Sequence, residues 1–298
     1  MECVEQPIPV WPGRMAGPLH VRETPSGPPD QAVFVHGLAG SATNWTDLMG
    51  ELRDIVTGHA VDLPGNGHSP APSGGDYSIT GHARAVIGLL EETGPAHLFG
   101  NSLGGAVVVR AAAMRPDLVR SLTLISPALP DLMPRYGPAR VFLATTPRLG
   151  ELAATVLGRL PAEQRVAASM AMIYADPGLL HPERLREAVA ELRRRDGLPY
   201  SGQAMIGSAR GIVAEYFRGS LWRDAATITA PTLLIYGRRD RLVRPIMARK
   251  AGRTFRDARL VLLPNCGHCA QMELPQVVAA EARRLILETR LGNAPLAS

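Results

Sequence analysis

Six short, nearly continuous runs of apolar residues are the feature that most restricts how this chain can fold. Apolar runs without polar alternation are typical of strands buried on both faces of a parallel sheet. The sequence therefore predicts a sheet that is covered by helices on both sides. The runs lie at residues 32–35, 55–62, 97–99, 122–125, 232–236 and 260–263.

Helical stretches separate these runs over most of the chain. Their apolar residues recur at the three- to four-residue spacing of an amphipathic helix. Strands that alternate with helices are joined by right-handed crossovers, so we expect an α/β fold with a mostly parallel central sheet flanked by helices. The stretches lie at residues 45–53, 80–92, 103–115, 245–255 and 275–291.

The alternation stops between residues 130 and 229, where only helical patterns joined by Pro and Gly occur. We interpret this region as an inserted all-helical cap, with residues 1–129 and 230–298 forming the α/β core domain. Ligands of open α/β folds bind at the carboxyl edge of the sheet, so the cap is expected to cover that edge. Its predicted helices lie at residues 139–146, 149–158, 162–174, 182–195 and 203–217.

A glycine-rich turn at residues 100–104, Gly-Asn-Ser-Leu-Gly, joins a predicted strand to a predicted helix. The G-x-S-x-G pattern in this context is typical of a sharp turn that exposes a nucleophilic serine. Side chains larger than hydrogen at Gly100 and Gly104 would collide across such a turn. A phosphate-binding loop would need a Gly-Lys-Ser/Thr sequence, which is absent. The pattern therefore indicates Ser102 as a nucleophile.

A serine hydroxyl needs a base, and the base needs an orienting acid. His268 follows the last predicted strand, and Asp240 follows the strand at residues 232–236. We predict that His268 is the base and Asp240 the acid, with Asp131, which follows the preceding strand, as the alternative acid.

The predicted strand at residues 32–35 ends in His36-Gly37-Leu38. A backbone N–H at this turn can face the nucleophile and bind a developing oxyanion together with the N–H of Leu103. We predict Leu38 as this donor, with Ala39 second, and we assign His36 a structural role.

Taken in order, these segments resemble the α/β-hydrolase superfamily over roughly residues 31–291. The resemblance implies a hydrolase, and it implies that residues 62–69 form a conformational turn near the site. Acyl transfer by such a serine needs no cofactor or metal, so we expect none. Residues 100–102 and 266–273 also resemble hydrolases that cut carbon–carbon bonds in ring-fission products. Those enzymes carry a tryptophan directly after the histidine, where this chain has Cys269.

The segment Cys266-Gly267-His268-Cys269 also spells the CGHC of disulfide isomerases. Redox activity would need this motif at the start of a helix in a thioredoxin-type unit. Here it follows a strand near the C-terminus, and the next predicted helix begins at Pro275. We therefore favour a triad histidine over a redox motif, and whether the two cysteines form a disulfide stays open.

The net charge of +5 raises the question of nucleic-acid binding. The cations are scattered arginines, Lys250 is the one lysine, and aromatic residues make up only 5%. Nucleic-acid binders concentrate charge and interleave aromatics, so we expect no nucleic-acid partner. No apolar run is long enough to span a membrane, and the N-terminus lacks the pattern of a secretory signal, so we expect a cytoplasmic protein.

The sequence thus predicts a serine hydrolase that cleaves a carboxylic ester of a small to medium hydrophobic molecule. Asn101, Met170 and Met205 are candidate substrate contacts, because methionine adapts to irregular apolar ligands. Hydrolysis of a carbon–carbon bond, of a thioester or of an amide, perhydrolysis, and a non-catalytic ligand receptor on the same fold remain alternatives. The oligomeric state is open.

Overall fold

The computed structural model describes residues 7–131 and 158–292. Its described strands form one sheet of eight, in the order β1-β2-β4-β3-β5-β6-β7-β8. Every neighbouring pair from β4 to β8 is parallel, which confirms the predicted parallel sheet. These strands are β3 (Gln31–Val35), β4 (Thr57–Asp62), β5 (Ala96–Asn101), β6 (Val119–Ile125), β7 (Thr232–Gly237) and β8 (Ala258–Leu263).

Two further strands, β1 (Gly13–Ala16) and β2 (Leu19–Glu23), form an antiparallel hairpin at one edge of the sheet. The sequence did not reveal them. β2 alternates buried and half-buried residues, and three of the four residues of β1 are exposed. Edge strands with one wet face carry no continuous apolar run.

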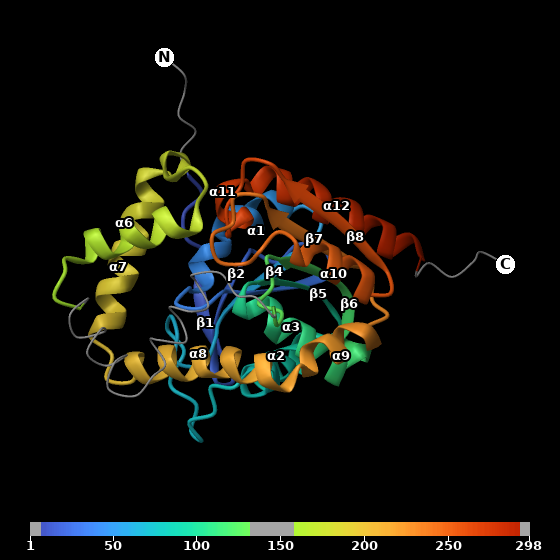
Figure 1. Cartoon of the computed structure of the whole chain (residues 1–298), viewed down its shortest axis with the longest axis horizontal. Coiled ribbons are helices and arrows are strands. Elements are labelled where there is room, and N and C mark those ends of the chain that lie inside the picture. Colours follow the sequence, from blue (N-terminus) through green and yellow to red (C-terminus); the bar gives the residue numbers. More distant parts are fainter. Residues whose placement is uncertain (1–6, 132–157, 293–298) are drawn as a thin grey trace, which may run out of the picture.

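Helices cover both faces of the sheet (Figure 1). One face packs against α1 (Thr46–Leu52) and α12 (Pro275–Gly292), and the other against α2 (Ile79–Thr93), α3 (Leu103–Met114) and α10 (Met247–Thr254). Alternate residues of β3 enter the two apolar cores, Val33 and Val35 on one side and Phe34 on the other. Because successive strand residues point to opposite faces, a strand between two cores must be apolar throughout.

The chain between β6 and β7 is helical where it is described, as expected for a cap. It forms α6 (Ala162–Ile173), α7 (Pro182–Asp196), α8 (Ser201–Arg218) and α9 (Ser220–Thr227). α6 and α7 share a small apolar core of their own, whereas Leu221 and Ala225 of α9 belong to the core beneath α3. The helix predicted at 139–146 and almost all of that at 149–158 lie outside the described residues. The cap boundaries at 130 and 229 stay a prediction.

Candidate active site

Ser102 occupies a strained turn between β5 and α3. Its φ of 53° and ψ of −116° lie outside the regions that L residues prefer. A Cβ atom added to Gly104 would lie 2.0 Å from the carbonyl oxygen of Val35, and one added to Gly100 would lie 2.6 Å from the oxygen of Gly104. The close packing of helix on sheet therefore requires both glycines, and it holds the serine in its unusual conformation. Strain of this kind concentrates at functional sites.

Asp240 and His268 form a buried pair at the same edge of the sheet. Asp240 follows β7 and His268 follows β8, and Nδ1 of His268 lies 2.9 Å from Oδ2 of Asp240. Their exposed fractions are 0% and 3%. The other carboxylate oxygen accepts the N–H groups of Leu242 at 2.7 Å and Val243 at 2.9 Å.

The carboxyl of Asp240 is held in its charged form. Burial alone would raise its pKa, but the charge and hydrogen bond of His268 and the N–H of Val243 together lower the pKa below its usual value. An ionised carboxylate on Nδ1 fixes the imidazole tautomer with its proton on that nitrogen, which leaves Nε2 free to accept a proton. Asp131, the alternative acid, lies 3.7 Å from the guanidinium of Arg244.

Asn101 ties the serine turn to the histidine loop. Its Nδ2 donates to the carbonyl oxygens of Ile125 and His268, both at 3.1 Å, and its Oδ1 accepts from the Cys269 thiol at 3.5 Å. The serine turn and the loop that carries His268 are thereby joined. Among the described residues, no hydrogen bond joins the Ser102 hydroxyl to the imidazole, an arrangement common in free enzymes, where this contact tightens when substrate binds.

The loop after β3 packs against Ser102. A Cβ atom added to Gly37 would lie 3.2 Å from the Cβ of Ser102. The buried His36 joins this loop to the end of β4, because its Nδ1 donates to the Gly37 oxygen at 2.7 Å and its Nε2 accepts from the Leu63 N–H at 3.0 Å. Burial lowers the pKa of His36, and these two bonds suit the neutral ring. The geometry thus gives His36 the structural role expected from the sequence.

The buried carboxylate of Glu273 is a part of the site that the sequence interpretation missed. Its Oε2 accepts the Gly267 N–H at 2.7 Å, and its Oε1 accepts the N–H groups of Ala175 at 2.9 Å and Asp176 at 3.1 Å. The N–H of His268 also donates to the Ile173 oxygen at 2.7 Å. The histidine loop is therefore fastened to the chain at the end of α6. Glu273 is the last residue of the short helix α11 (Ala270–Glu273). In the sequence, the one sign of its role was an acidic residue close after His268.

Cys266 and Cys269 are free and buried. Burial raises the pKa of both thiols far above the usual range, which disfavours the thiolate that redox exchange needs. A short helix, α11, begins directly after Cys269, earlier than the helix start predicted at Pro275. The CGHC segment nevertheless lies in the histidine loop of an α/β sheet and not in a thioredoxin-type unit.

The predicted substrate contacts lie in different surroundings. Met170 is buried in the small core of α6 and α7, and Met205 of α8 is 45% exposed. All three polar contacts of Asn101 are with the protein itself. No group of three or more metal-binding side chains occurs in the described parts of the chain. Within residues 7–131 and 158–292, no helix has the length and apolar character needed to cross a membrane.

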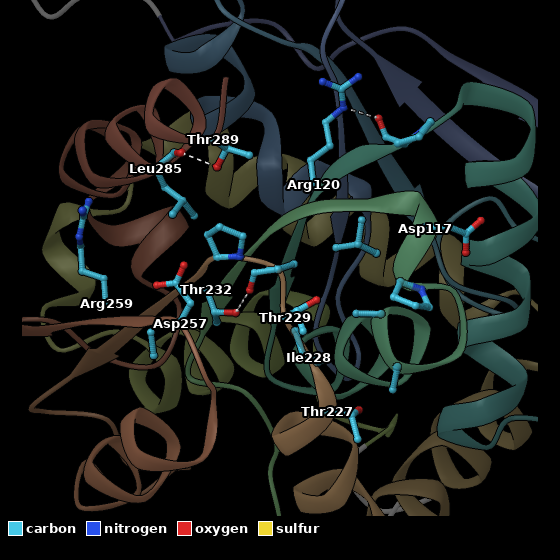
Figure 2. A pocket seen from close by; sticks show the side chains of 18 of the residues that line it. Asp117, Arg120, Thr227, Ile228, Thr229, Thr232, Asp257, Arg259, Leu285 and Thr289 are labelled. Carbon is cyan, nitrogen blue, oxygen red and sulfur yellow. Dashed lines mark hydrogen bonds between the residues drawn. The ribbon is translucent and has the colours of Figure 1, made fainter. Parts of the chain in front are cut away.

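A cavity of about 910 Å³ lies at the opposite edge of the sheet, where β6, β7 and β8 begin. Figure 2 shows its lining, which includes Arg120, Thr232 and Asp257. Ser102, Asp240 and His268 follow the carboxyl ends of their strands, so this cavity is remote from them. Active sites of open α/β sheets lie at the carboxyl edge.

Known proteins similar to this chain include several hydrolases. The chain is 29% identical over 268 residues to 2-(acetamidomethylene)succinate hydrolase of Mesorhizobium japonicum, a match that covers 87% of this chain and 88% of the other. It is 26% identical over 252 residues to the monoacylglycerol lipase ABHD6 of Homo sapiens, covering 83% and 72%. A meta-cleavage product hydrolase of Pseudomonas fluorescens has the same fold, with a TM-score of 0.74 at 20% identity over 94% of this chain and 98% of that one.

The model of the alpha/beta hydrolase fold family matches residues 33–275. This match runs from within β3 through β8 and includes the serine turn, Asp240 and His268. The chain therefore belongs to the alpha/beta hydrolase fold family.

Proposed function

We propose that this protein is a serine hydrolase that cleaves a carboxylic ester, with Ser102 as nucleophile, His268 as base and Asp240 as the orienting acid. The observation that carries the proposal is the strained Ser102, in a turn that Asn101 bonds to the loop of the buried His268–Asp240 pair. In this pair, Nδ1 of His268 lies 2.9 Å from Oδ2 of Asp240. A nucleophile, a base and an acid that orients the base are the three parts that acyl transfer by a serine requires.

In the proposed reaction, Nε2 of His268 removes the proton of the Ser102 hydroxyl as the oxygen attacks the ester carbonyl. The N–H groups of Leu38 and Leu103 bind the oxyanion. Leu103 is the first residue of α3, and the first N–H groups of a helix lack intrahelical partners. Asp240 stabilises the imidazolium, which then protonates the departing alcohol. Water activated by His268 releases the acid and restores Ser102.

The proposed substrate is a small to medium ester with an apolar acyl or alcohol group. An alcohol is an easier leaving group than an amine or a carbanion, so the site needs to assist the departure of the leaving group least when it cleaves an ester. Two relatives in the comparison are named as hydrolases of small organic molecules or acylglycerols. Asn101 is proposed as a tether between the serine turn and the histidine loop, and no longer as a substrate contact.

A series of p-nitrophenyl esters from acetate to decanoate tests the proposal. Wild-type protein should hydrolyse part of the series, and Ser102→Ala should lose about a millionfold in kcat, because the nucleophile is gone. Ser73→Ala, at an exposed serine, is the matched control and should keep full activity. The chain-length profile would measure the size of the acyl pocket.

Two outcomes would contradict the proposal. Hydrolysis that survives in Ser102→Ala would exclude Ser102 as the nucleophile. A folded wild type that hydrolyses no ester would exclude esterase activity, and assays with ring-fission diketones and with small-molecule binding in the absence of turnover would follow.

A further inference from the structure

The loop that carries the proposed oxyanion donor Leu38 is anchored to the core at both of its ends. At its start, His36 bonds to both the Gly37 oxygen and the N–H of Leu63. At its end, the N–H of Ala42 donates to Oδ1 of Asp62 at 2.7 Å. Both anchors are buried and belong to the sheet and its connections. The position of the loop ends is therefore fixed by the core.

The tip of this loop is held differently. Leu38 and Ala39 form the centre of a turn that is closed by a hydrogen bond of 3.0 Å from the Gly40 N–H to the Gly37 oxygen. Ala39 has a φ of 61°, which is costly for a residue with a Cβ atom and persists only where the surroundings enforce it. Among the described residues, one side chain bonds to the tip: Nη1 of Arg195 donates to the Ala39 oxygen at 2.8 Å.

Arg195 differs from the two arginines that precede it in the last turn of α7. Arg193 pairs with Glu163, and Arg194 pairs with Glu191. The guanidinium of Arg195 makes no ion pair with any described residue, and its one described hydrogen bond is the bond to Ala39. The side chain is half-buried, and burial lowers its pKa below the usual value. The carboxylates of Glu191 and Asp196 offset part of this cost electrostatically, but neither forms an ion pair with the guanidinium. Charge pairing therefore does not explain the bond to Ala39.

The last turn of α7 rests on the core through its arginines. Arg194 also donates to the Gly67 oxygen, in the turn that follows β4. At the other end of α7, Arg184 pairs with Asp47 of α1 at 2.6 Å. α7 therefore contacts the core at both of its ends. The bond from Arg195 to the loop tip requires the last turn of α7 to lie in this position.

We propose that Arg195 is a positioning residue for the oxyanion hole: it holds the Ala39 carbonyl so that the tip keeps the conformation that presents the Leu38 N–H to the substrate. If Ala39 relaxed to a negative φ, the peptide groups at Leu38 and Ala39 would rotate, and these groups carry the predicted donor and its alternative. The oxyanion hole is complete only while α7 is seated on the core. This inference rests on the serine-hydrolase function proposed above.

The test uses Arg195→Met, which keeps an unbranched apolar side chain and removes the hydrogen-bond donors, and Arg195→Lys, which restores a donor group. Arg193→Met is the matched control, because Arg193 lies on the same helix turn and its side chain is 63% exposed. For each variant, kcat and KM are measured with p-nitrophenyl butyrate. The Ki of butylboronic acid is measured as well, because its adduct with a serine places a negatively charged oxygen where the oxyanion would lie.

Arg195→Met should lower kcat by about ten- to a hundredfold, less than the loss of a whole oxyanion donor causes, and leave KM within about a factor of two of the wild-type value. The Ki of the boronic acid should rise by a similar factor, and Arg195→Lys should recover part of both. Arg193→Met should match the wild type. A general loss of stability would not change kcat and the Ki of the boronic acid by the same factor. If the methionine variant does not fold, the same two measurements are made with Arg195→Lys.

Two results would overturn the inference while the proposed function stands. One is a folded Arg195→Met with the wild-type kcat and boronic-acid Ki. The other is a rise in KM alone, which would make Arg195 a substrate contact. Failure of the proposed function looks different, because the wild type itself would then neither hydrolyse the ester nor bind the boronic acid.

Discussion

At the scale of single residues, the two carboxylate oxygens of Asp240 have different partners. One binds the backbone of its own loop, and the other binds the proposed catalytic base. Oδ1 accepts two backbone N–H groups of its own loop, and Oδ2 accepts His268. The first set fixes the carboxylate in place, so that the second can fix the imidazole. This division explains how a charged group can be fully buried, since every donor around it favours the ionised form.

Asp240→Asn should lower kcat by about ten-thousandfold, because an amide at this place favours the wrong tautomer of the base. The measurement is kcat for p-nitrophenyl butyrate, together with the melting temperature to establish that the variant folds. Asp257→Asn, at an exposed aspartate remote from His268, serves as the control. An Asp240→Asn variant within tenfold of the wild type would show that another group orients His268.

At the scale of elements, the junction of β5, its turn and α3 is the most restricted part of the chain. The Cβ of an alanine at position 104 would lie 2.0 Å from a backbone oxygen of β3, and neither strand nor helix can move without disturbing the apolar core that the two share. By contrast, a Cβ at Gly74 meets nothing within 4 Å.

Gly104→Ala should therefore destabilise the fold by roughly 3 kcal/mol or more, which corresponds to a melting temperature lower by roughly 6 °C or more. Gly74→Ala should melt within about a degree of the wild type, because nothing surrounds its added methyl group. Thermal unfolding of the three proteins gives the answer. Equal melting temperatures for the two variants would mean that α3 is not packed on β3 as described.

The elements were predictable where a local pattern carried the signal. The strands between two apolar cores, such as β3, could be read from continuous apolar runs, and the Gly-Asn-Ser-Leu-Gly turn from its glycines. The hairpin of β1 and β2 could not be predicted in this way, because it is half-exposed and pairs with β4 across distant sequence. The contact of Glu273 with Ala175 joins residues 98 positions apart, and that of Arg195 with Ala39 joins residues 156 positions apart. A local sequence pattern cannot predict contacts over such separations.

At the scale of the whole molecule, buried neutral histidines tie stability to pH. Burial lowers the pKa of His82 and of His97 to about 4, whereas both side chains should titrate near 6.5 in the unfolded chain. His82 bonds to Ser208 of α8 at 2.9 Å, and His97 bonds to Ser121 of β6 at 2.8 Å. Between pH 6.5 and 4 the unfolded state binds more protons than the folded state, so stability falls as pH falls.

This contribution is complete above pH 6.5 and is lost progressively towards pH 4. At pH 5, each of the two histidines should have lost on the order of 2 kcal/mol of stability. Urea unfolding at pH 7.5 and pH 5 measures the loss, which His97→Gln should reduce and Ser73→Ala, at an exposed serine that does not titrate, should leave unchanged. A His97→Gln protein with the same loss as the wild type would contradict this assignment.

The fastening of the histidine loop to the end of α6 bears on how such proteins diversify. Insertions between two strands are commonly treated as modules that evolution exchanges while the catalytic core stays constant. Here the backbone at Ile173, Ala175 and Asp176 supplies the hydrogen-bond partners of His268 and Glu273. A replacement of the whole segment between β6 and β7 would remove these partners, and with them the support of the proposed base. An exchange that keeps the histidine loop in place must therefore keep this short stretch at the end of α6.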